Sequence, residues 1–154
     1  MANFTDILNK PAEQIEKPKP RPVGTYLCVV NGPHKQREVK GKDGTEFPVV
    51  DVNLKAMQAQ EDVDQTALAE SGGVGFNIQN TFFLTNAEGN DNSWPLKNFL
   101  ENHLGIASQG KSLAQMLAEA PGKQVLATVK HEMYVDKSTN EPAVAMRLAG
   151  TAKV

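Results

Sequence analysis

Alternating prolines near the N-terminus constrain this chain more than any other feature. Pro18, Pro20 and Pro22 are separated by single basic residues. Each proline fixes φ at about −65° and has no backbone N–H, so the segment cannot join the interior of a sheet and favours an extended polyproline II conformation. We therefore expect residues 1–23 to form an extended arm and residues 24–154 to form the folded domain.

The arm also carries apolar side chains, because a short amphipathic stretch precedes the prolines. A segment that becomes ordered on binding can cover a large surface at modest net affinity. This pattern is typical of an assembly component more than of an enzyme. The residues that we expect to bind a partner are Phe4, Ile7, Leu8, Ile15, Pro18, Pro20 and Pro22.

The length and composition are those of one globular domain. The chain has 154 residues, of which 40% are hydrophobic and 22% are charged. No apolar run approaches the roughly 18 residues that span a bilayer, and the N-terminus lacks a secretory signal, so we expect cytoplasmic synthesis and no membrane contact. Cys28 is the single cysteine, which excludes an internal disulfide and a thiolate metal cluster. We expect it to be a small buried side chain.

The hydrophobic pattern predicts a mainly β domain. Strands are expected at residues 25–30, 34–39, 47–54, 76–84, 123–134 and 143–148. In the third of these, Val50, Val52 and Leu54 alternate with polar residues and should point inward. An Asp43-Gly44 pair provides the tight turn before this strand.

Three short helices are expected between the strands, within residues 60–70, 93–104 and 112–120. Ser93 is a candidate N-cap for the second helix, and Ser112 with Gln115 matches a capping box for the third. Helices inserted before a C-terminal β-hairpin predict an α+β chain built on a small OB-like Greek-key β-barrel. A β-sandwich is the alternative.

The titratable side chains do not converge on a catalytic site. His34 lies beside a turn, His103 on a helix and His131 in a late strand, and His103 is expected to be a packed, hydrogen-bonded residue. Asp62 and Asp64 lack the further ligands of a Ca²⁺ loop and suit the start of a helix. We therefore expect no enzymatic activity, no catalytic residues, no metal, no cofactor and no small-molecule substrate.

Two features suit nucleic acid. One is a basic hairpin, and the other is a set of strand aromatics that includes Tyr26, Phe47 and Phe82. The candidate contacts are Lys35, Arg37, Lys40, Lys42 and the aromatic Tyr134, whose neighbours are polar. The alternative is that the lysines only keep a loop soluble and the aromatics pack in the core. The net charge of −2 argues mildly against a DNA-coating role.

Several short motifs occur along the chain together with the lysine-rich hairpin. They are Pro22-Val23-Gly24-Thr25-Tyr26, Phe82-Phe83-Leu84-Thr85, Trp94-Pro95-Leu96-Lys97-Asn98-Phe99-Leu100, Leu104-Gly105-Ile106 and Pro121-Gly122-Lys123. This combination resembles a family of small bacteriophage proteins. The resemblance covers about residues 20–150 and implies an OB fold and a single-stranded-DNA-binding-like role in replication or recombination modules.

This sequence departs from the family pattern in three respects. Residues 148–154 are not the acidic tail that such phage proteins usually carry, the net charge is slightly negative, and the proline arm suits a protein lattice. Phages also reuse small β-domains as capsid cement or decoration proteins. We therefore expect a structural protein on the capsid surface of the virion, whose arm docks on the major capsid protein or on other copies of itself. The alternative is a phage single-stranded-DNA-binding protein.

Overall fold

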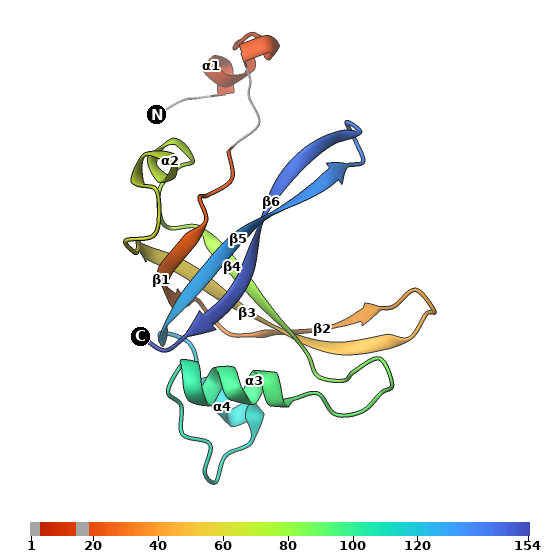
Figure 1. Cartoon of the computed structure of the whole chain (residues 1–154). Coiled ribbons are helices and arrows are strands. Elements are labelled where there is room, and N and C mark those ends of the chain that lie inside the picture. The colour runs from red at the N-terminus through yellow and green to blue at the C-terminus, as the bar shows by residue number, and fades with distance from the viewer. Residues whose placement is uncertain (1–3, 15–18) are drawn as a thin grey trace.

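The computed structural model describes residues 4–14 and 19–154 (Figure 1). Two of the expected partner-binding residues, Ile15 and Pro18, lie outside the described residues. None of the described helices is long and apolar enough to cross a membrane.

The fold is mainly β, as the sequence predicts, with six antiparallel strands in one sheet. The strands are β1 (Gly24–Val30), β2 (Lys35–Lys40), β3 (Glu46–Ala59), β4 (Asn77–Phe83), β5 (Gln124–Asp136) and β6 (Glu141–Ala152). Hydrogen bonds join the strands in the order β2-β3-β1-β5-β6, and β4 pairs with β3. All six predicted strands are confirmed.

Register explains how this sheet curls. β1 pairs with the C-terminal part of β3 and β2 with its N-terminal part, while β4 pairs with the middle of β3. β1 and β2 therefore follow one another along one edge of β3, and β4 occupies the opposite edge. The sheet curves so far that β4 comes close to β6 without a hydrogen-bonded ladder between them (Figure 1).

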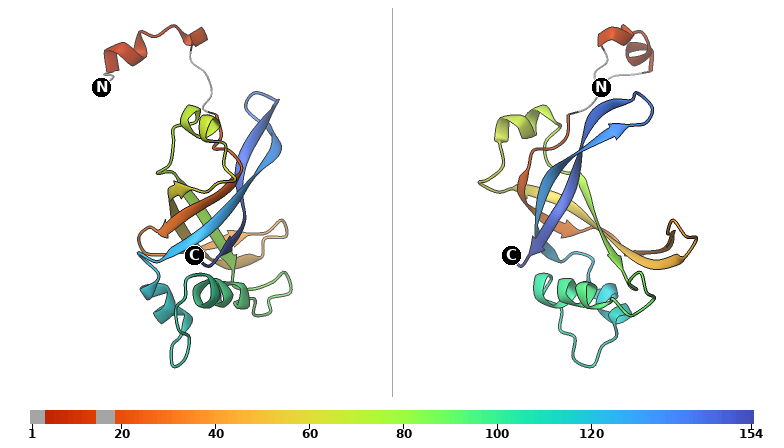
Figure 2. Two further views of the ribbon diagram at one scale, coloured as in Figure 1. Left: turned by 60° about the vertical axis from the view of Figure 1, so that its left-hand side comes forward. Right: turned by 45° about the vertical axis from the view of Figure 1, so that its right-hand side comes forward.

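The helices are short and lie at the two ends of the curled sheet. They are α1 (Phe4–Leu8), the 3-10 turn η1 (Ala12–Gln14), α2 (Gln65–Glu70), α3 (Trp94–Asn98), the π-helical turn η2 (Phe99–His103) and α4 (Leu113–Glu119). The segment α3–η2 and α4 cover one end, and α2 lies at the other end together with the N-terminal arm (Figure 2).

The two helix caps that the sequence predicts have different outcomes. The capping box is confirmed: the Gln115 N–H donates to the Ser112 hydroxyl at 3.2 Å, and the Gln115 side chain accepts from the Ser112 N–H at 2.7 Å. Ser93 is the N-cap residue of the second helix, as the sequence predicts, but its side chain makes no capping hydrogen bond. The backbone of Ser93 is helical (φ −82°, ψ −10°), whereas a capping side chain needs an extended N-cap residue. The N–H and the hydroxyl of Ser93 both donate to the Asp91 carboxylate.

The core lies inside the curl of the sheet and is closed by the helices. Val50, Val52 and Leu54 point inward as predicted and are at most 2% exposed. Cys28 is also buried, and burial raises the pKa of its thiol to about 11. From the helical end, the fully buried side chains are Leu96, Phe99, Leu100 and Met116.

Two hairpins extend beyond the curled sheet. The β2–β3 hairpin and the β5–β6 hairpin leave from opposite ends of the sheet but project toward the same side (Figures 1 and 2).

Candidate nucleic-acid interface

Strands β2, β3 and β4 present one continuous surface away from the core. Because side chains alternate along a strand, the residues next to Val50, Val52 and Leu54 point outward. Directly opposed residues share a face, so the pairs aligned in register extend this surface over all three strands. We call the part of this surface between Phe83 and Asn53 the outer face, and within it Val49 and Asp51 are buried. It comprises Lys35, Arg37, Val39, Phe47, Val49, Asp51, Asn53, Gln79, Thr81 and Phe83.

Asp51 organises the centre of the outer face. Its carboxylate accepts hydrogen bonds from Arg37 Nε at 2.5 Å and from Thr81 Oγ1 at 2.7 Å. Burial by itself would raise the pKa of Asp51, but the hydrogen bonds and the positive charge of Arg37 outweigh it and hold this pKa below its usual value. The Arg37 side chain remains 47% exposed, so the pair holds a cation in place at the surface.

An aromatic pair forms one end of the outer face. The rings of Phe47 and Phe83 meet edge to face with their centroids 6.5 Å apart, and Phe83 is 44% exposed. An exposed ring on a strand can stack against a nucleobase of any identity. Phe83 was not among the residues singled out from the sequence, although alternation from Ile78 through Phe82 places it outward.

A polar hollow lies at the other end of the outer face. Its volume is about 450 Å³, and its walls offer amides, an imidazole and an ammonium group. Such groups suit the phosphates, sugars and base edges of a strand. The residues that line it are Asn31, Pro33, His34, Lys35, Asp51, Asn53 and Gln79.

The structure divides the basic hairpin that the sequence suggests. Lys35 and Arg37 are on the outer face, whereas Lys40 pairs with Glu46 on the other side of the hairpin. On that side, a hydrogen bond from protonated Glu46 to Glu38 and the negative charge of Glu38 raise the pKa of Glu46. Lys42 lies in the turn between the strands. The two-residue period of a strand therefore places only half of the four predicted basic contacts together.

Tyr134 lies on β5, in the other hairpin, on the side that faces away from the core. It is 42% exposed and pairs in register with Ala143. Of the other aromatics named from the sequence, Phe47 lies on the outer face, whereas Tyr26 and Phe82 pack inward. Tyr26 is fully buried and donates its hydroxyl to the Pro22 carbonyl at 2.7 Å, and Phe82 packs against Phe99 with centroids 5.2 Å apart.

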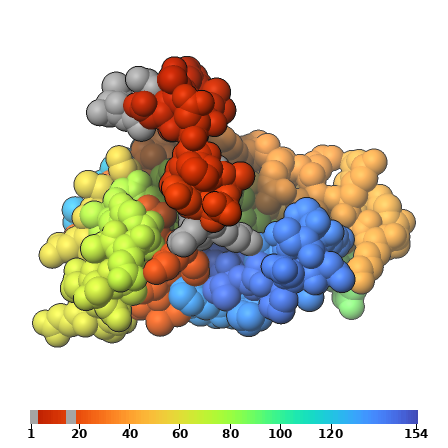
Figure 3. All heavy atoms as spheres, turned by 90° about the horizontal axis from the view of Figure 1, so that it is seen from above, coloured from red at the N-terminus to blue at the C-terminus, as the bar shows by residue number. Residues whose placement is uncertain are grey.

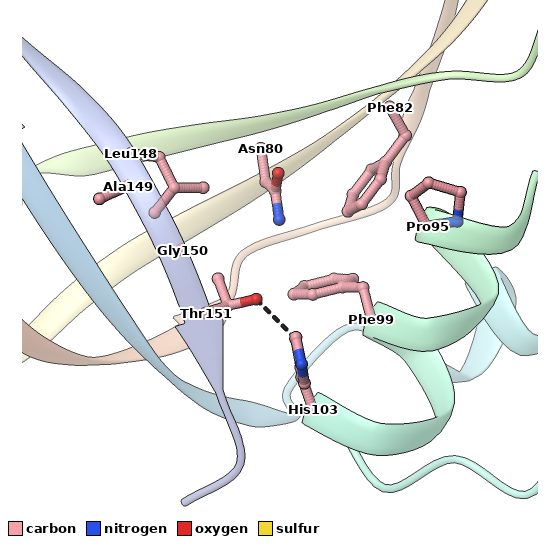
Figure 4. A pocket seen from close by; sticks show the side chains of 9 residues that line it. All are labelled: Asn80, Phe82, Pro95, Phe99, His103, Leu148, Ala149, Gly150 and Thr151. Carbon is pink, nitrogen blue, oxygen red and sulfur yellow. Dashed lines mark hydrogen bonds between the residues drawn. The ribbon is translucent and has the colours of Figure 1, made fainter. Parts of the chain in front are cut away.

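A second pocket occupies the seam where β4 and β6 approach without pairing (Figure 4). Its volume is about 320 Å³. His103 Nδ1 and Thr151 Oγ1 are hydrogen-bonded at 2.7 Å across it, which confirms His103 as a hydrogen-bonded residue. The Asn80 amide points toward the same space. Its lining consists of Asn80, Phe82, Pro95, Phe99, His103, Leu148, Ala149, Gly150 and Thr151.

The arm residues expected to bind a partner have different environments. Phe4, Ile7 and Leu8 are exposed on α1, and Pro20 is also exposed. Pro22, by contrast, is buried against the domain. The last residues before β1 therefore pack as part of the domain, and the free portion of the described arm is the part that precedes them.

Among residues 4–14 and 19–154, no group of three or more histidine, cysteine or acidic side chains could hold a metal ion. No family model matches the chain, and no curated protein matches it either. The outer face, with a fixed arginine between an aromatic pair and a polar hollow, is the surface whose chemistry best suits a ligand.

Proposed function

We propose that this chain binds single-stranded nucleic acid across the outer face, on a phage-type OB barrel. The observation that carries the proposal is the exposed ring of Phe83, 44% accessible, on the same face as Arg37 and Lys35. Aromatic platforms beside cations are how sequence-tolerant single-strand binders hold their ligands. This role is non-enzymatic. It places nucleic-acid binding first, whereas the sequence favoured a capsid protein and left single-stranded-DNA binding as the alternative.

The strand connections support an OB assignment. β1 and β2 would act together as the first strand of the barrel, with β3, β4, β5 and β6 as the second to the fifth. The helices α3 and α4 then fall between the third and fourth strands. In an OB fold the second and third strands, and the loops that flank them, bind oligonucleotides. Those strands are the ones that carry most of the outer face.

The chemistry of the face suggests how a strand would lie. Bases would stack on Phe83 beside Phe47, phosphates would lie near Arg37 and Lys35, and the amides of the hollow would contact sugars and base edges. For single strands, the plot of log affinity against log salt concentration has a slope of about −0.7 for each phosphate that the protein neutralises. Two cations on this face therefore predict a slope of about −1.4.

The test is a fluorescence-anisotropy titration with a labelled oligo-thymidine at low and moderate salt. The Phe83→Ala variant should bind about tenfold more weakly, because stacking on one ring contributes about 1–3 kcal/mol. Val74→Ala is the matched control, since Val74 is exposed to a similar degree, 42%, but lies outside the outer face. Urea unfolding of both variants checks that they are folded.

Two results would count against this function. The full chain could fail to bind oligo-thymidine even at low salt, or Phe83→Ala and Val74→Ala could bind as tightly as the unmodified protein. The first result rejects nucleic-acid binding, and the second rejects the outer face as its site.

A second candidate is a capsid cement or decoration subunit on the virion surface, made in the host cytoplasm. It is favoured by the exposed apolar side chains of α1, where Phe4 is 84% and Leu8 is 78% exposed. The arm would dock on the major capsid protein. A variant that lacks residues 1–20 should then fail to bind shells, and full occupancy by that variant would reject this role.

A further inference from the structure

The β5–β6 hairpin carries an apolar surface that the other described residues leave uncovered. Along β5, Met133 and Val135 follow Val129 on the side that faces the core, but they lie beyond the curled sheet. They are 66% and 60% exposed. We call this surface the hairpin apolar face, and it comprises Met133, Val135 and their register partners Val144 and Pro142.

A second uncovered apolar surface lies on α1. Phe4, Ile7 and Leu8 recur at helical spacing and are 84%, 54% and 78% exposed. Every residue from 4 to 14 is exposed, so α1 makes no buried contact with the described part of its own domain. The chain therefore presents one apolar helix and one apolar strand face, and each lacks a cover.

The arm leaves the domain beside the hairpin apolar face. His131 Nε2 donates to the Arg21 carbonyl at 2.6 Å, and His131 is on the same side of β5 as Met133 and Val135. Arg21 is held further by its Nε, which donates to the Gly73 carbonyl at 3.2 Å, and by its position 5.0 Å from the Phe76 ring. Seen from above, the arm crosses between α2 and this hairpin (Figure 3).

We propose that α1 of one copy docks on the hairpin apolar face of a second copy, so that the arm links copies of this chain. Residues 9–20 separate α1 from the anchored Arg21, and the part of this segment outside η1 could span at most about 30 Å. This reach is sufficient to cross to a neighbouring molecule. α1 has the chemistry that this contact requires, because its three apolar side chains would cover Met133 and Val135.

Docking on a second copy is favoured over docking within one chain because of the prolines. Pro20 and Pro22 immediately precede and follow the anchored Arg21, and proline-rich segments act as semi-rigid spacers. Every residue of α1 is exposed, so α1 does not cover the hairpin apolar face of its own chain. The contact requires no nucleic acid, so it can be tested separately from the proposed function.

The test is disulfide trapping between two single-cysteine variants, Leu8→Cys and Val135→Cys. The native Cys28 is buried and its pKa is raised to about 11, so it does not compete. One variant is isotopically labelled, the two are mixed without nucleic acid and oxidised, and the products are resolved by mass spectrometry. We expect the mixed dimer to form at least several-fold faster than either homodimer.

The matched control replaces Val135→Cys by Met57→Cys, because Met57 is 52% exposed on β3 and outside the hairpin apolar face. Cross-linking of Leu8→Cys to Met57→Cys at the same rate would show random collision and overturn the proposal. The double variant Leu8→Cys/Val135→Cys tests docking within one chain. If it forms only an internal disulfide and the mixture forms no mixed dimer, the proposal is wrong.

A second readout uses no cysteine chemistry. Leu8→Glu and Val135→Glu each place a charge on a surface that is already exposed, so both variants should fold. Sedimentation velocity of the full-length protein should show association that rises with concentration, and either variant should abolish it. Equal sedimentation of all three proteins as monomers at high concentration would also contradict the proposal.

Discussion

At the scale of single residues, Asp51 is the informative side chain. It is the one buried charged residue in the described part of the chain, at 8% exposure. Both of its oxygens are occupied, by Arg37 on β2 and by Thr81 on β4. It therefore ties three strands together at the middle of the outer face.

We predict that Asp51→Asn lowers the free energy of unfolding by about 1–3 kcal/mol at pH 7, because it weakens hydrogen bonds to a buried group. The pKa of Asp51 is lowered in the folded state, so its contribution is full above the unfolded value of about 3.9 and is lost as the pH falls through the folded value. Urea unfolding at pH 7 and at pH 3 should therefore show the difference between the two proteins shrinking in acid.

Asp64→Asn is the matched control for this prediction. Asp64 caps α2 by accepting from the Ala67 N–H, and asparagine caps helices equally well. The control should change stability by less than about 0.5 kcal/mol.

Asp51→Asn should also bind oligo-thymidine somewhat more tightly at low salt, since it removes a negative charge beside Arg37. A weaker affinity with an unchanged fold would contradict that electrostatic account.

At the scale of elements, α4 depends on its cap. The helix has only seven residues, Leu113–Glu119, and such short helices are marginal without capping and packing. Its buried side chains are Met116 and Leu117, which help to close the core. The reciprocal hydrogen bonds between Ser112 and Gln115 thus support an element that seals one end of the curled sheet.

We predict that Ser112→Ala costs about 1 kcal/mol of stability, because it leaves an N–H of the first helical turn without its acceptor. The measurement is chemical unfolding followed by circular dichroism. Ser108→Ala, in the loop before α4, is the control and should be close to neutral. If the two variants unfold alike, the cap does not contribute as the geometry indicates.

At the scale of the whole molecule, the division between arm and domain can be located. Residues 4–14 are exposed, so a variant that lacks residues 1–20 should unfold with the same free energy as the full chain. A variant that lacks residues 1–22 should lose about 1–3 kcal/mol, because it removes buried Pro22 and leaves the buried Tyr26 hydroxyl without its acceptor. Thermal or urea unfolding of both truncations checks this, and equal stability would refute it.

Local patterns were sufficient to predict most elements. The six strands, the inward side of β3 and the capping box of α4 all depend on residues close together in sequence, and all are confirmed. Ser93 occupies the predicted N-cap position, but its backbone is helical and its side chain does not cap the helix. A sequence motif does not specify the backbone conformation of its first residue.

The candidate site was only partly predictable. Lys35 and Arg37 were named from a run of basic residues, but their separation from Lys40 follows from strand alternation once the pairing of β2 is known. Phe83 was not named as a contact, although alternation from Ile78 through Phe82 places it outward. Its place beside Phe47 depends on the pairing of β3 with β4.

The sequence by itself determined which segments are strands and helices and which side of each strand is apolar, because these depend on residues within a few positions of one another. Only the tertiary structure decided that Arg37, Asp51 and Thr81 meet, since they lie 14 and 30 positions apart and on different strands. It also left the hairpin apolar face uncovered. The physical reason is that register and curvature arise from pairing between distant strands, which local periodicity does not specify.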